Sequence, residues 1–468
     1  MHHSESHPHL SIPTPDPQQV CQLVQADGRE LLTLSVRRRG RPTHLSWMHL
    51  CLGVLACVLM QWRSQLDLRR LLCFEGFWHV PPVLPICDQA IYNRLERAGP
   101  WMRQLFDQLS QRMRARLEPW QDHSLAPFAT QVIALDECVL DRVGRWLPEL
   151  RALLRGDARL RAGRLSALFD LRLQQWLRVD LLEDAATNCK VHALEMIEQL
   201  QENTLLLFDR GYFSFEWLDV LTERRLWWIT RYSNRASYTV VHGIYEADGV
   251  RDLIVLFGVH RSDRARYPVR LIQFWYHKKF YQYVTNVCDP TVLPLAEVAR
   301  LYARRWDIEL GFRLLKDHLQ LRLLWCAKWP VIQVQLWAGL LLAQYFHGLQ
   351  HEIAMQAGVR PQDVSLDLLT RMTGRMFQAG RDPLEVVRWW GREAGLIRPS
   401  TRTVYAVPFV DQAWVRPPPE EVLEPREHVR YAHRSDRQRQ ERAQARAAKQ
   451  AAKTHQGACH APPTNLLE

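Results

Sequence analysis

Two short apolar runs that each end at an aspartate constrain the fold of this chain more than any other feature. "VIAL" leads into Asp136 and "LLLF" leads into Asp209. Apolar runs of four to eight residues that stop at a charged or turn residue indicate buried strands. A strand end holds its side chain rigidly at the edge of a sheet, where α/β folds place their sites. The pattern predicts an α/β fold with two carboxylates at strand ends, although a lone aspartate is more often a turn former or helix cap.

The remaining chain divides by texture into helical, strand-rich and polar stretches. Helical patterns occupy the N-terminal part and return from Leu295 to about Ala394, whereas short apolar strands lie between them. The predicted segments are a disordered N-terminus (1–17), a helical domain (18–125), an α/β domain (126–394) with a β-rich insertion at about 226–290, and a C-terminal extension (395–468) with a disordered basic tail.

Composition favours a polyanionic partner. The chain has 61 Lys and Arg against 50 Asp and Glu, a net charge of +11, and an isoelectric point near 9.3. Such an excess suits nucleic acid first and an acidic membrane surface second, although ordinary solubility explains it as well. None of the ten cysteines forms a C-x-x-C pair, so we expect reduced thiols and a cytoplasmic protein. The apolar run Leu50–Met60 is shorter than the about 20 residues that a membrane span needs, and it predicts a buried helix.

An ordered polar stripe marks Leu301–Leu319, which the pattern predicts to be one helix. Tyr302, Arg305, Glu309 and Lys316 project within roughly 60° of one another at 3.6 residues per turn. Glu309 borders the apolar face of the helix, where solvation explains a carboxylate poorly. An Arg305–Glu309 pair within the helix is the alternative, but it contributes only a few tenths of a kcal/mol and leaves Tyr302 and Lys316 unexplained.

Three convergent carboxylates, Asp136, Asp209 and Glu309, would suit divalent cations. Two Mg²⁺ ions about 3.5–4 Å apart can activate a nucleophile and stabilise a leaving oxygen. Hard oxygen ligands favour Mg²⁺ or Mn²⁺, and the missing Cys and His spacing argues against zinc. Arg305 could bind a phosphate through two hydrogen bonds.

The stripe resembles the Y-x2-R-x3-E-x6-K signature of one large family of bacterial insertion-sequence transposases, the insertion sequence four type of the DDE class. Four such matches arise by chance about once in 10⁵ starting points. "ALFDLR", "LLLFDRGY", "YVTNV" and "KWPVIQVQLWAGLLLAQYF" resemble family segments in the same order, so the similarity runs from about Cys87 to Gly348.

The resemblance implies a ribonuclease H-like catalytic core with a β-rich insertion, and an N-terminal helical domain that binds the DNA ends. It implies that Asp136, Asp209 and Glu309 hold two Mg²⁺ or Mn²⁺ ions. Tyr302, Arg305 and Lys316 would contact phosphates of the transposon end. The expected activity is cut-and-paste transposition of double-stranded DNA by a homodimer in the bacterial cytoplasm, associated with the nucleoid and with no membrane partner.

Four further residues are candidate DNA contacts. Arg210 directly follows Asp209, and Tyr281 is the nearest match to a tryptophan that stacks on an extruded base in some family members. Arg39-Gly40-Arg41-Pro42 resembles the core of an AT-hook, whose arginines enter narrow minor grooves, but a basic loop between helices is the alternative.

Departures from the family pattern leave the three carboxylates in place. Glu137 follows Asp136 where a small residue is common, and strand alternation predicts that it points to the other face. The family's common His-Asp pair is not evident, and "NCKVHAL" stands near its place. A metal-dependent DNA nuclease and a non-catalytic DNA-binding protein derived from a transposase remain the alternatives.

Overall fold

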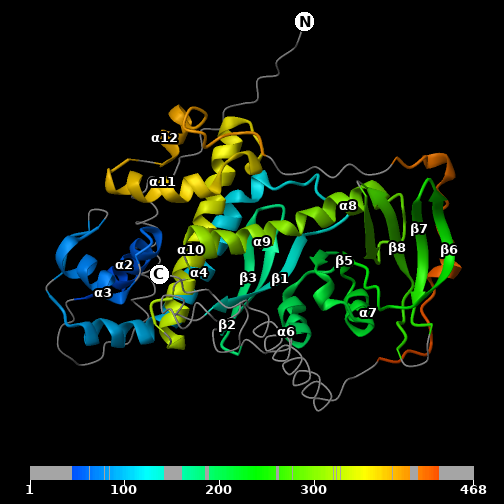
Figure 1. Cartoon of the computed structure of the whole chain (residues 1–468), viewed down its shortest axis with the longest axis horizontal. Coiled ribbons are helices and arrows are strands. Elements are labelled where there is room, and N and C mark those ends of the chain that lie inside the picture. The colour runs from blue at the N-terminus through cyan, green and yellow to red at the C-terminus, as the bar shows by residue number, and fades with distance from the viewer. Residues whose placement is uncertain are drawn as a thin grey trace, which may run out of the picture.

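One mixed sheet runs through the computed structural model, with helices packed along it (Figure 1). The structure describes residues 45–431, except for 142–160, 185–188, 260–262, 401–408 and the short gaps 63, 78–79, 84, 277, 320, 323, 327 and 382. Across these residues the sheet has nine strands in the order β3-β2-β1-β4-β5-β9-β8-β7-β6. The predicted disordered N-terminus, Arg39, Arg41 and the basic tail beyond residue 431 lie outside the described residues.

One half of the sheet contains both apolar runs that lead into an aspartate. The second run forms a strand that ends just before Asp209, as predicted, but the predicted strand end at Asp136 is wrong. The first strand continues to Asp141 because it stays paired with its antiparallel neighbour. The strands of this half are β1 (Val132–Asp141), β2 (Arg161–Asp170), β3 (Gln175–Leu182), β4 (Leu205–Phe208) and β5 (Trp227–Arg231). β1, β2 and β3 pair antiparallel, whereas β1, β4 and β5 run parallel. Leu135 of β1 lies opposite Phe208 of β4, so Asp136 and Asp209 follow at the same level.

The β-rich insertion continues this sheet instead of forming a separate layer. Its strands are β6 (Tyr238–Ala247), β7 (Val250–Phe257), β8 (Val269–Tyr276) and β9 (Lys279–Thr285), and β9 pairs antiparallel with β5. The short helix α6 (Cys189–Met196) lies between β3 and β4 along the chain, and α7 (Phe215–Glu223) lies between β4 and β5. Part of the C-terminal extension returns to this region, because Tyr431 donates to the buried carboxylate of Asp219 in α7 at 2.8 Å.

The remaining helices surround α10 (Trp329–Ala357), which is buried along most of its length because it is apolar on nearly every side. They are α2 (Trp47–Leu59), α3 (Gln65–Arg70), a π-helical turn (Leu71–Glu75), α4 (Asp88–Leu117), α11 (Leu366–Gln378) and α12 (Pro383–Trp390). The buried part of α2, Leu50–Leu59, confirms the predicted buried helix. No helix in the described part of the chain is long and apolar enough to cross a membrane.

The N-terminal helices that the structure describes, from residue 45 onward, share their hydrophobic core with the rest of the chain. Leu50 of α2, Phe106 of α4 and Ala134 of β1 belong to one continuous cluster of buried side chains, together with α10. The rings of Phe106 and Trp337 lie 5.2 Å apart, which ties α4 directly to α10. The predicted separate helical domain is therefore not set apart by its packing.

The predicted single helix over Leu301–Leu319 is interrupted, and that prediction is wrong in this respect. α8 (Leu295–Arg304) is followed by the single residue Arg305, which caps it. α9 (Trp306–Arg313) comes next, and a π-helical turn covers Leu314–His318. The N–H of Arg305 donates to the carbonyl of Tyr302, which is the tighter three-residue spacing, although the backbone dihedral angles of Arg305 stay helical. The interruption is a change of hydrogen bonding, which side-chain periodicity does not reveal.

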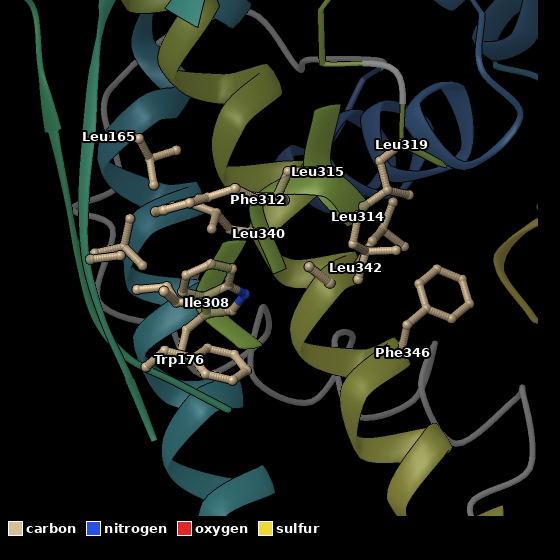
Figure 2. Packing of buried hydrophobic residues seen from close by; sticks show 14 of the residues in the cluster. Leu165, Trp176, Ile308, Phe312, Leu314, Leu315, Leu319, Leu340, Leu342 and Phe346 are labelled. Carbon is tan, nitrogen blue, oxygen red and sulfur yellow. The ribbon is translucent and has the colours of Figure 1, made fainter. Parts of the chain in front are cut away.

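The apolar face of α9 and the π-helical turn fixes their position. Figure 2 shows Ile308, Phe312 and Leu315 packed among Leu165 and Trp176 of the strands and Leu340 of α10. The Phe312 and Trp176 rings lie 5.4 Å apart. Because this face is clamped between the sheet and α10, the opposite edge of α9 is held over the middle of β1 and the end of β4.

Candidate active site

Strand alternation aims Asp136 and Glu137 at opposite faces of β1. Val132 and Ala134 belong to the core cluster that includes α9 and α10, whereas Ile133 and Leu135 belong to the cluster beneath α6 and α7. Asp136 faces the α9 side, and Glu137 pairs on the other face with Arg164 of β2 at 2.7 Å. The structure therefore confirms that Glu137 points away from Asp136.

Arg305 brings two of the predicted carboxylates together. Its Nη1 lies 3.1 Å from Oδ2 of Asp136, and its Nη2 lies 2.5 Å from Oε1 of Glu309. The arginine side chain is almost fully buried, at 6% exposure, whereas those of Asp136 and Glu309 are 19% and 31% exposed. One guanidinium thus joins the middle of β1 to the stripe of α9.

Arg231 meets the third carboxylate, and the sequence analysis missed it. This arginine is the last residue of β5, and its Nη2 lies 2.8 Å from Oδ1 of Asp209. The signal was present, because "WWITR" is another short apolar strand that ends at a charged residue. Nothing in the sequence alone says that β5 pairs with β4, which is what places Arg231 beside Asp209.

The pKa of Asp136 reflects the closeness of the other two carboxylates. Burial raises the pKa of Asp136 to about 6, and the negative charges of Glu309 and Asp209 act in the same direction, while the Glu137 N–H and Arg305 oppose them. Burial also acts to raise the pKa of Asp209, but hydrogen bonds from Arg231 and the Arg210 backbone outweigh it and leave the pKa below its ordinary value. Asp209 therefore holds its negative charge more firmly than Asp136.

The other two stripe residues, Tyr302 and Lys316, contact backbone carbonyls of β4 and β1. The Tyr302 hydroxyl lies 3.5 Å from the carbonyl oxygen of Phe208, directly before Asp209. Lys316, on the π-helical turn, donates from Nζ to the carbonyl oxygen of Val139 at 2.9 Å. All four stripe residues therefore contact β1, the end of β4 or one another.

The additional candidates lie at the margin of the site or outside the described residues. Arg210 is exposed and directly follows Asp209. Tyr281 is partly buried, and its ring stacks on Phe274 at 5.5 Å and Tyr283 at 6.4 Å. Tyr283 in turn lies 5.2 Å from the Tyr302 ring, so an aromatic row leads from Tyr281 to the stripe. Arg39 and Arg41 lie outside the described residues.

The chemistry of the donor set fits a hard divalent cation, whereas the place for one is occupied by Arg305. Asp136, Asp209 and Glu309 offer only carboxylate oxygens, the ligands that Mg²⁺ and Mn²⁺ prefer. Among the described residues, no three His, Cys, Asp or Glu side chains are placed to hold one ion together. The guanidinium spans Asp136 and Glu309 in this arrangement, so a cation shared by these carboxylates requires Arg305 to withdraw.

Comparison with known proteins matches the segment that carries most of this site. Residues 155–344 match the family model described as a transposase DDE domain. This range includes Asp209, Glu309 and the stripe, and it begins after Asp136.

Two curated relatives have similar sequences. The chain is 28% identical over 248 residues to transposase InsG for insertion sequence element IS4 of Escherichia coli (strain K12), which covers 48% of this chain and 54% of that protein. It is 25% identical over 148 residues to the putative transposase y4zB of Sinorhizobium fredii (strain NBRC 101917 / NGR234), covering 30% and 41%. The matches thus span about half the length of these relatives or less. They confirm the resemblance to insertion sequence four-type DDE transposases.

Among solved structures, piggyBac transposase in a synaptic complex with hairpin DNA has a TM-score of 0.41 and 11% identity, covering 87% of this chain and 89% of that chain.

Proposed function

We propose that this chain, whose residues 155–344 match the transposase DDE domain, is a DNA transposase that cuts insertion-sequence ends and joins them to target DNA. One observation carries the proposal: the two aspartates that follow apolar runs lie at the same level of neighbouring strands, and the glutamate of the signature stripe meets them there. Arg305 joins Asp136 to Glu309, and Arg231 pairs with Asp209. The strand order β3-β2-β1-β4-β5 supports a ribonuclease H-like core.

The chain's own residues suit an in-line displacement at a phosphodiester. Asp136, Asp209 and Glu309 form the acidic edge, and Arg305, Arg231 and Lys316 surround it with positive charge. Arginine can grip a phosphate through two hydrogen bonds, so these cations would hold the DNA backbone against the acidic edge. One site can serve both cleavage by water and attack by the freed 3′-hydroxyl, because both steps are phosphoryl displacements.

The same three carboxylates would hold Mg²⁺ or Mn²⁺, with two ions as the expected number. When bound, such ions supply charge neutralisation and activation of the attacking oxygen. Burial raises the pKa of Asp136 to about 6, so the carboxylate is mainly ionised at neutral pH and available as a ligand.

The partner is double-stranded DNA, at the element ends and at the target. The net charge of +11 supports a polyanionic partner. Two ends must be paired for cut-and-paste movement, so the DNA complex holds a homodimer. The N-terminal helices and Arg39 and Arg41 would contribute end recognition, with the protein on the nucleoid in the bacterial cytoplasm.

A cleavage and strand-joining assay tests this function. The substrates are duplexes from the DNA that flanks the gene, incubated with the full chain and Mg²⁺ or Mn²⁺. A transposase releases defined 3′-ends and then links them to a second, labelled target duplex. The linked product distinguishes it from the alternatives.

Each alternative predicts a different product. A nuclease with the same core cuts without forming linked product. A non-catalytic DNA-binding protein shifts the duplex in a gel and leaves it intact with either ion. Either of these two outcomes contradicts the proposed function.

A further inference from the structure

Arg305 occupies an unusual position for a residue expected to contact DNA. Its two terminal nitrogens are committed to Asp136 and Glu309, and the residue is 5% exposed. Its Nε is buried and makes no hydrogen bond within the described structure. The guanidinium also lies against the rings of Tyr302 and Trp306, at 5.7 and 5.9 Å.

A divalent cation and this guanidinium compete for the same oxygens. Mg²⁺ requires carboxylate oxygens at 2.0–2.1 Å in a nearly octahedral arrangement. Oδ2 of Asp136 and Oε1 of Glu309 instead accept hydrogen bonds from Arg305 at 3.1 and 2.5 Å. Two positive charges at this distance also repel each other in a poorly solvated site.

The helix junction that carries Arg305 lies next to solvent. Arg305 stands at the junction of α8 and α9, and Trp306 beside it is 47% exposed. The surface beside Arg305 is therefore open to solvent at Trp306. A phosphate there would accept the two parallel hydrogen bonds that the carboxylates now receive.

We infer that Arg305 is a positioning residue that exchanges between the carboxylates and a DNA phosphate, and thereby links divalent-cation binding to DNA binding. This inference rests on the proposed function of the site. With Arg305 on Asp136 and Glu309, the carboxylates are neutralised and their affinity for a cation is low. A DNA phosphate that draws Arg305 away raises that affinity, and linkage requires the bound cation to raise DNA affinity by the same factor.

Arg231 differs from Arg305 in both geometry and exposure. It contacts only Asp209, and its side chain is 52% exposed, whereas Arg305 bridges two carboxylates and is buried. Solvent weakens the competition between Arg231 and a cation. The linkage is therefore assigned to Arg305.

The test measures Mn²⁺ binding to the full chain without DNA, by the electron paramagnetic resonance signal of free Mn²⁺. The variants are Arg305→Gln and the charge-conserving Arg305→Lys. The matched control is Arg304→Gln, which removes a neighbouring guanidinium that pairs with Asp307 at 2.8 Å and does not touch the three carboxylates. Glu309→Gln checks that the Mn²⁺ is bound at this site.

We expect Arg305→Gln to bind Mn²⁺ roughly tenfold more tightly than the parent chain. Arg305→Lys should bind it several-fold more tightly, because a shorter single ammonium does not span the two carboxylates as the planar fork does. Arg304→Gln should match the parent chain. A duplex carrying the element end should tighten Mn²⁺ binding more in the parent chain than in Arg305→Gln.

Thermal unfolding provides a second readout that also monitors folding. Without Mn²⁺, the Arg305→Gln variant should melt below the parent chain because Asp136 and Glu309 repel each other. Saturating Mn²⁺ should remove most of that difference, since ligand binding to the folded state stabilises it.

Several outcomes would overturn the inference. Equal Mn²⁺ affinity in the parent chain, Arg305→Lys and Arg305→Gln contradicts competition. An equal gain in Arg304→Gln attributes the effect to general charge instead. If the parent chain cuts and joins DNA while the Arg305 variants bind Mn²⁺ unchanged, only the linkage fails. If none of the proteins binds Mn²⁺ and none cuts DNA, the proposed function fails with it.

Discussion

Each carboxylate of the candidate site is balanced by a guanidinium from another element or turn. Arg305 forms ion pairs with Asp136 and Glu309, and Arg231 forms one with Asp209. Without such partners, three negative charges at one sheet edge would repel one another and suffer from lost hydration. The opposite pKa shifts of Asp136 and Asp209 follow from this balance, because burial dominates at the first and hydrogen bonding at the second.

Replacing Arg231 by Gln tests its role at the residue scale. The substitution removes the 2.8 Å contact that orients Asp209, so we expect cleavage to fall about 10–100-fold, the usual cost of losing a partner of a ligand. The matched control is Arg225→Gln, which removes an exposed arginine that pairs with Glu202 just before the same strand. Quantified cleavage rates that fall equally for both variants would contradict a specific role for Arg231.

At the scale of elements, the sequence could predict the strands and the stripe but not their fine geometry. Asp136 and Asp209 were predictable because each ends an apolar run, and Glu309 because its neighbours repeat at helical spacing. The interruption at Arg305 was not predictable, since its dihedral angles remain helical and only the hydrogen bonding changes. Partners distant in sequence, such as Arg231 and Asp209, depend on strand pairing that no local pattern encodes.

The position of α9 depends on a close approach at Gly311. A Cβ atom placed there would lie 2.8 Å from Cζ2 of the fully buried Trp176. We expect Gly311→Ala to displace α9 or Trp176, to destabilise the fold by about 1–3 kcal/mol, and to slow cleavage because Glu309 moves with the helix. Gly243→Ala, where a Cβ atom meets nothing within 4 Å, is the control.

Denaturant unfolding and cleavage rates measure the two effects of Gly311→Ala. A variant with parent-like stability and rate would show that the contact with Trp176 relaxes freely. The clamp on α9 would then not position Glu309.

The buried His347 of α10 makes stability depend on pH. Burial lowers the pKa of His347 to about 4, below the value near 6.5 of an unfolded chain. Between these values the unfolded chain binds the proton and the folded chain does not, so stability rises with pH and is lost as pH falls through 6.5 towards 4. The contribution to the free energy of unfolding changes by about 2 kcal/mol between pH 7 and pH 5.

Unfolding of His347→Leu in urea at pH 7 and pH 5 measures this contribution. The variant should lose about 2 kcal/mol less than the parent chain over the interval. His123→Gln alters an exposed histidine and should lose as much as the parent chain. An unchanged pH dependence in His347→Leu would show that His347 is protonated in the fold.

At the scale of the whole molecule, one sheet and one long helix connect the predicted parts. The insertion strands extend the sheet that carries the candidate site through β5 and β9, and the described N-terminal helices share their core with α10. Composition and periodicity identified these stretches as helical or β-rich, but they do not report which stretches share a core. That information lies in contacts between residues far apart in sequence, such as Phe106 with Trp337.

The central claim is that Asp136, Asp209 and Glu309 act as one catalytic site. The most direct test measures metal-dependent cleavage of element-end DNA by Asp136→Asn, Asp209→Asn and Glu309→Gln, with DNA binding measured in parallel. Glu297→Gln is the control, because this glutamate of α8 pairs with Arg300 one turn along the same helix. We predict that each of the three variants binds the duplex but loses cleavage by at least about 10³-fold, while Glu297→Gln cuts at the parent rate. Retained cleavage in any one of the three would contradict a shared site.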